Sequence, residues 1–285
     1  TNKGLEVDLG LKLLTQGDFK WTLNANYSFN DNLVTDLSGV ESVFLAGFTG
    51  TSSRAVEGEA IGALWGGRFA RDAGGNYVLD ANGFPTLDPT EGVLGDPNPD
   101  WIGGLGSVLS YKGLSLSVQF ETSQGNEMWT GTEGVLKYFG IDPETANISV
   151  APQDLQTYAG ETIPAGTEFR GNIGNFGGGD VALDADWYTA EGGGFGVQSE
   201  TFIQDASWTR LRELTLAYQL PSKILKNSGF TSAEISLTGR NLFLWTPIEG
   251  FDPDLNLTGA TLGRGLDYFT NPSTKSYLFT VKIGF

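Results

Sequence analysis

The last thirteen residues alternate between apolar side chains and mostly small or polar ones. Tyr277, Phe279, Val281, Ile283 and Phe285 occupy every second position, with Leu278, Thr280, Lys282 and Gly284 between them. Alternation with a period of two is typical of a β-strand with two unlike faces. A strand of this length that ends in Phe is typical of the closing strand of a membrane-spanning β-barrel. A strand of an ordinary β-sandwich can show the same pattern, so recurrence of the pattern decides between the two.

Six further segments carry the same alternation. We predict strands at about 4–15, 19–30, 101–111, 114–128, 208–220, 231–246 and 273–285. Short turns at 16–18, 112–113 and about 221–230 join strand pairs, and long loops at 31–100, 122–207 and 246–272 lie at the opposite end. This asymmetry is typical of outer-membrane barrels, whose long loops face outside. Bacterial barrels close with an even number of strands, so seven strands predict a piece of a larger antiparallel transmembrane barrel, without a second domain.

The amino-acid composition argues against several classes of functional site and partner. The chain has neither Cys nor His, which removes disulfides, thiolate metal sites and the usual general base, so we predict no enzyme, no cofactor and no metal site. Asp252 with Asp254, and Asp180 with Asp184 and Asp186, offer oxygen ligands that suit Ca²⁺, but they lack an EF-hand register and we interpret them as solvated acids. The three loops hold 28 of the 34 acidic residues and 6 of the 17 basic ones, which argues against nucleic acid as a partner.

A series of short motifs, in this order along nearly the whole chain, carries a family resemblance. They are Asn2-Lys3-Gly4, Gly95-Asp96-Pro97-Asn98-Pro99-Asp100, Tyr111-Lys112-Gly113-Leu114, Trp208-Thr209-Arg210-Leu211-Arg212 with Leu214-Thr215-Leu216-Ala217-Tyr218, Leu220-Pro221, Gly239-Arg240-Asn241-Leu242-Phe243, Gly250-Phe251-Asp252-Pro253-Asp254, and Pro272 with the terminal strand. Together they resemble the SusC/RagA-type TonB-dependent transporters of the Bacteroidetes outer membrane. The ranges 31–94 and 122–207 correspond to variable loops of that family.

The resemblance implies a plugged barrel of about 22 strands, of which this chain would be the last seven, without the N-terminal plug domain. It implies a multi-pass outer-membrane protein with extracellular long loops, surrounded by outer-membrane lipid and lipopolysaccharide. Implied partners are the remaining barrel strands, a SusD-like surface lipoprotein that acts as a lid, and TonB, contacted through the missing N-terminal region. The implied function is energised import of oligosaccharides or peptides.

Two other interpretations stay open. A barrel of this type could serve as a structural or assembly partner in a larger surface complex without transport. A secreted all-β adhesin would instead pack its apolar strand faces on a second sheet.

Site residues can be named only from residue type and position. Trp129, Tyr138, Trp187 and Tyr188 in the second loop are candidates for stacking on sugar rings at the barrel mouth, although loop aromatics also pack their own loops. Trp21, Tyr27, Tyr111, Tyr218 and Tyr277 are expected in aromatic girdles. Arg210, Arg212 and Arg240 are candidates for the lumen or the outer rim. Alternation places Arg212 on the face of Leu214, so we expect it above the hydrocarbon zone.

Overall fold

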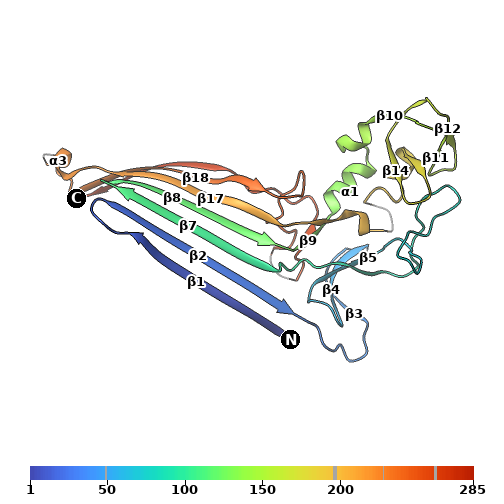
Figure 1. Ribbon diagram of the computed structural model, residues 1–285, viewed down its shortest axis with the longest axis horizontal. Coiled ribbons are helices and arrows are strands. Elements are labelled where there is room, and N and C mark those ends of the chain that lie inside the picture. The colour runs from blue at the N-terminus through green and yellow to red at the C-terminus, as the bar shows by residue number, and fades with distance from the viewer. Residues whose placement is uncertain (49, 195–197, 227, 260–261) are drawn as a thin grey trace.

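The computed structural model describes residues 1–48, 50–194, 198–226, 228–259 and 262–285. Seven long strands form one antiparallel sheet in the order β1-β2-β7-β8-β17-β18-β20 (Figure 1). They are β1 (Asn2–Leu14), β2 (Phe19–Asn32), β7 (Trp101–Tyr111), β8 (Leu114–Gln124), β17 (Trp208–Gln219), β18 (Ser232–Trp245) and β20 (Ser276–Gly284). The all-β antiparallel architecture predicted from the alternation is confirmed. β1 and β20 each pair with a single strand, so within the described residues the sheet is open at both edges and barrel closure is not seen.

The sheet has one apolar and one polar face along its whole length. The register places Phe279 beside Leu237, and Leu214 beside Val118, so large apolar side chains continue from strand to strand. They are exposed: Phe279 has 69% of its surface accessible and Leu237 has 56%. On the other face Thr215 and Thr238 share a hydroxyl hydrogen bond of 2.8 Å. A continuous exposed apolar face of this extent requires an apolar environment, because soluble proteins expose much smaller patches.

Aromatic side chains lie toward both ends of the apolar face. At the end with the short turns, Phe19 and Tyr111 are cross-strand partners with ring centroids 6.5 Å apart. At the end with the long loops, Tyr27 stacks on Trp101 at 5.7 Å, and Tyr277 is 73% exposed. Aromatic girdles at two levels are a property of transmembrane barrels.

The two ends of the sheet differ in their connections (Figure 1). Tight turns follow β1 and β7, and a segment with the one-turn helix α3 (Ser222–Leu225) follows β17. The turn after β7 is Lys112-Gly113, and both residues have positive φ (47° and 87°), as a two-residue hairpin of this type requires. The three long connections all lie at the opposite end and carry further structure of their own.

The loop elements fall into three groups by sequence. The first loop holds β3 (Ser42–Gly47), β4 (Thr51–Val56), β5 (Ala63–Gly66) and β6 (Gly92–Gly95). The second holds β9 (Glu127–Thr130), α1 (Gly131–Tyr138), η1 (Pro143–Ala146), β10 (Ile148–Val150), β11 (Leu155–Thr157), β12 (Thr162–Ile163), β13 (Glu168–Arg170), β14 (Asn172–Asn175), β15 (Asp180–Leu183), α2 (Ala185–Tyr188), η2 (Glu200–Phe202) and β16 (Ile203–Asp205). The third holds β19 (Leu266–Asp267).

The three loops contact one another and contain most of the buried core. β9 of the second loop pairs with β16 of the same loop and with β19 of the third. Phe69 and Phe84 of the first loop pack with Trp187 of the second in a buried cluster. The loops therefore form a joint cap at one end of the sheet. Of the helices in the described part of the chain, none has the length and apolar character needed to cross a membrane.

Candidate functional site

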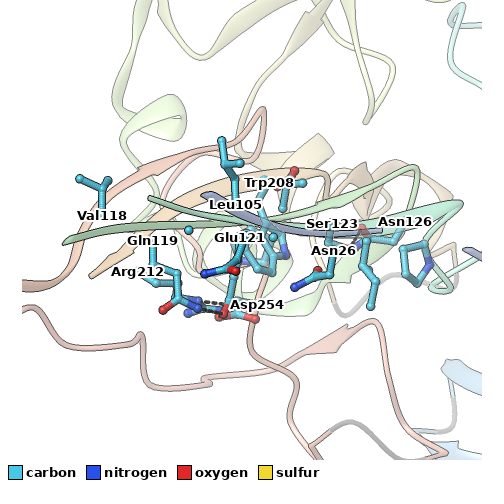
Figure 2. Close-up of a pocket in the computed structure, with 18 of the residues that line it drawn as sticks. Asn26, Leu105, Val118, Gln119, Glu121, Ser123, Asn126, Trp208, Arg212 and Asp254 are labelled. Carbon is cyan, nitrogen blue, oxygen red and sulfur yellow. Dashed lines mark hydrogen bonds and ion pairs between the residues drawn. The ribbon is translucent and has the colours of Figure 1, made fainter. Parts of the chain in front are cut away.

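The polar face of the sheet contains a cavity of about 650 Å³ near the loop end, between the sheet and the third loop (Figure 2). Its floor is built from alternate residues of neighbouring strands: Asn24, Asn26, Gly104, Gly106, Ser117, Gln119 and Glu121. Gly104 lies close to the Asn26 amide, because a Cβ at this position would lie 2.9 Å from the amide nitrogen. Small residues on β7 thus leave room above the sheet, and amide and hydroxyl groups supply hydrogen-bonding capacity.

Arg212 reaches this cavity because β17 contains a β-bulge. Against β8 the register shifts between Leu211 and Glu213, so β17 has one extra residue at this point. Against β18 the register shifts at the same place in the opposite sense, with the extra residue on β18. The side chain of Arg212 contacts Glu121 on β8 and forms an ion pair of 2.6 Å with Asp254 of the third loop (Figure 2). The prediction that Arg212 shares the face of Leu214 is wrong, because the bulge reverses the alternation between these two residues.

Arg210 forms a second and more deeply buried contact with the same loop. It is 2% exposed, and its guanidinium pairs with the Asp252 carboxylate and donates to the Ser273 hydroxyl. The Ser273 backbone N–H donates to Asp252 at 3.1 Å. Burial alone would raise the pKa of Asp252, but hydrogen bonds from Ser273 and the charge of Arg210 leave this pKa below its usual value. Asp252 therefore stays ionised and holds both ends of the third loop against β17.

The two arginines also determine what Asp252 and Asp254 can bind. Both carboxylates are engaged by guanidinium groups, and Arg212 Cζ lies 5.0 Å from the ring centroid of Trp208. Asp184 caps α2 instead, accepting hydrogen bonds from the N–H groups of Asp186 and Trp187. In the described ranges no three Asp or Glu side chains gather in a way that could hold a metal ion.

The four loop aromatics named from the sequence do not gather at one site. Trp129 is 5% exposed, packs with Leu64, Phe202 and Leu266, and stacks on Tyr268. Trp187 and Tyr188 are buried in the cluster shared with the first loop. Tyr138 lies beside Phe139, with ring centroids 5.2 Å apart.

Tyr138 and Tyr188 come together at a second, smaller cavity in the loop cap. Burial raises the pKa of Tyr188 to about 12, and its hydroxyl donates to Glu144 at 3.0 Å. The contacts described for the four aromatics are packing and hydrogen-bonding contacts within the loops. Their binding of ligand stays a prediction.

Sequence reasoning did not identify the polar-face cavity as a site. The available signal was the coincidence of Asn24 and Asn26 with Gly104 and Gly106, at positions that face the same side of neighbouring strands. Asp254 also lines this cavity, but it lies in the third loop. The sequence of that loop has no periodic pattern from which its path over the sheet could be predicted.

The sheet with its apolar outer face, polar inner face and one-sided loops defines the chain as wall strands of an outer-membrane β-barrel. Comparisons with known proteins agree. No family model matches the chain. TonB-dependent receptor P3 of Formosa agariphila is 25% identical over 313 residues, which span 100% of this chain and 28% of the relative. TonB-dependent receptor P26 of the same organism is 28% identical over 284 residues, which span 92% of this chain and 26% of the relative.

Solved structures show the same fold. The RagAB peptide transporter matches with a TM-score of 0.64 and 21% identity, over 99% of this chain and 29% of the matched chain. The RagAB peptide importer in its open-open state matches with a TM-score of 0.63 and 19% identity, over 100% of this chain and 28% of the matched chain. The resemblance to SusC/RagA-type TonB-dependent transporters is confirmed. The chain spans little more than a quarter of the length of these relatives.

Proposed function

We propose that this chain forms part of the wall and the outer cap of a TonB-dependent outer-membrane transporter that imports oligosaccharides or peptides together with a SusD-like surface lipoprotein. The observation that carries the proposal is the polar-face cavity: it lies on the inner side of barrel strands, at the end that bears the long loops, and one of its walls is a loop held by Arg210 and Arg212. Similarity to TonB-dependent receptors and to the RagAB peptide transporter supports it.

The chemistry of the cavity supports passage of polar solutes. Amide groups of Asn24, Asn26 and Gln119 and the hydroxyl of Ser117 can exchange hydrogen bonds with sugar hydroxyls or peptide groups. Transport, lid and energy coupling through TonB belong to the whole protein, and we propose them for it on the basis of its relatives.

A block of the cavity tests the proposal. Gly106→Trp in the full-length protein places a large ring on the polar face, where a Cβ meets no atom closer than 3.9 Å. We expect uptake of cargo to fall at least about tenfold with unchanged amounts in the outer membrane, because the ring occupies the path. Uptake is measured by mass spectrometry of an oligosaccharide and peptide mixture depleted from the medium, with an uncoupler as the energy control.

The matched control is Leu116→Trp, which adds the same ring to the apolar face of the adjacent strand β8. It should leave uptake unchanged. Equal uptake by wild type, Gly106→Trp and a deletion strain would refute transport and favour a structural role for the barrel.

A further inference from the structure

A second cavity, of about 270 Å³, lies in the loop cap and shares no described lining residue with the polar-face cavity. It forms where the end of α1, η1, β13 and α2 meet. The side chains that matter for its chemistry are those of Tyr138, Phe139, Thr145, Arg170, Asp184 and Tyr188. Tyr138 and Tyr188 are two of the loop aromatics named as candidates from the sequence, and the function proposed above for the polar-face cavity does not involve them.

Arg170 is unusual among the arginines of this acidic chain. Six of the eight, Arg54, Arg68, Arg71, Arg210, Arg212 and Arg240, have a carboxylate oxygen within 4.0 Å. Arg170 has no such partner among the residues that the structure describes. Its Nε donates to the Thr145 carbonyl at 2.8 Å and its Nη2 to the Gly140 carbonyl at 3.5 Å. These contacts orient the guanidinium at the cavity without neutralising its charge.

The other charged groups of the lining are already engaged. Lys137 forms ion pairs of 2.8 Å with Glu133 and 2.7 Å with Glu144. The Asp184 carboxylate accepts hydrogen bonds from the backbone N–H groups of Asp186 and Trp187 at the start of α2, and burial raises its pKa above the usual value. Arg170 is therefore the charge in this lining that remains available to a ligand. An oriented guanidinium is suited to a carboxylate, which it can bind through two parallel hydrogen bonds.

The remaining lining favours a ring beside that carboxylate. Tyr138, Phe139 and Tyr188 surround the same space, and Phe139 is 62% exposed. Aromatic walls pack against the flat side of another ring, whether aromatic or a sugar. A volume of about 270 Å³ is near the lower end of the usual range for ligand pockets, so it suits one ring with its substituents rather than a long chain.

We propose that this cavity binds a small ring-bearing carboxylate, with Arg170 as the partner of the carboxylate and the three aromatic residues around the ring. Two sources share this chemistry: the C-terminal residue of a peptide and a uronic acid. The proposal concerns binding at the loop cap and does not depend on transport.

The test uses the purified full-length protein in detergent and isothermal titration calorimetry. The probes are N-acetylphenylalanine and galacturonate, each compared with a neutral counterpart, N-acetylphenylalanine amide and galactose. We expect at least one acid to bind about tenfold or more tightly than its neutral counterpart, because a hydrogen-bonded charge pair is lost in the neutral compound. The acid that binds more tightly identifies the source.

Arg170→Gln should abolish the preference for the acid, and Arg170→Lys should retain part of it. The matched control Arg240→Gln removes an exposed arginine of β18, outside the loop cap, and should leave the preference unchanged. Two results would overturn the proposal: wild-type protein that binds each acid no better than its neutral counterpart, or a preference that persists in Arg170→Gln. The wild-type comparison remains decisive even if the variants fail to fold.

Discussion

Arg210 joins the sheet to the third loop through a buried ion pair with Asp252. Its side chain is 3% exposed and that of Asp252 is 6% exposed, so both charges have left water and depend on each other. Removing one partner of a buried pair leaves an uncompensated charge. We expect Arg210→Met to weaken the attachment of the third loop by about 3–5 kcal/mol. Hydrogen exchange of the segment around Ser273 should accelerate accordingly.

Two further variants test whether the buried Arg210–Asp252 ion pair is what holds the third loop. Arg240→Gln breaks an ion pair in which the arginine side chain is 54% exposed, and should change stability by at most about 1 kcal/mol. The double variant Arg210→Met with Asp252→Leu should recover most of the loss, because an apolar pair of similar volume can replace a buried ion pair. Unchanged exchange in Arg210→Met would show that other contacts hold the loop.

Arg212 shows where residue-level prediction from sequence stops. Alternation gives the face of each residue only while the strand stays regular, and the bulge turns Arg212 and Glu213 to the same side. No residue in this segment marks the bulge, because the extra residue is an arginine rather than a glycine. Its position depends on pairing with β8 and β18, which single-strand periodicity does not contain.

At the scale of the element, β20 offers the clearest test of the apolar face. Phe279 lies in the middle of this strand, is 69% exposed and pairs with Leu237. Phe279→Arg should destabilise the membrane-inserted protein by about 2–4 kcal/mol if the side chain faces lipid at mid-depth. Equilibrium unfolding of the full-length protein in lipid vesicles measures this difference.

The neighbouring position provides the control. Thr280 pairs with Ser236 on the polar face, so Thr280→Arg places the same charge on the side away from lipid and should cost much less. A similar loss in both variants would show that the two faces of β20 do not differ in environment.

The elements also differ in how far the sequence determines them. Alternation over nine to fourteen residues predicts the long strands, because each face is uniform and the period can be counted. The loop strands have two to six residues, too few for a period. Most of them pair within their own loop, and β9 also pairs with β19 of another loop. Side-chain contacts between loops, such as Phe84 with Trp187, add to this pairing, so only the folded cap defines these strands.

At the scale of the whole molecule, the sheet and the cap differ in how they are stabilised. The buried apolar clusters lie in the cap, where Leu64, Phe84 and Leu266 are fully buried. The sheet instead leaves its apolar face and the two edge strands β1 and β20 uncovered within the described chain. The cap can therefore satisfy its own side chains, whereas the sheet depends on an apolar environment and on further strands.

This difference predicts how residues 1–285 behave when expressed without the rest of a barrel. Unpaired edge strands and a continuous apolar face promote association, because backbone groups at an edge pair readily with another chain. We expect oligomers or aggregates by light scattering after size exclusion in detergent, whereas the full-length protein should give a single defined species. A monodisperse, detergent-free monomer of residues 1–285 would contradict this expectation, because its apolar face would have to be sealed against protein rather than lipid.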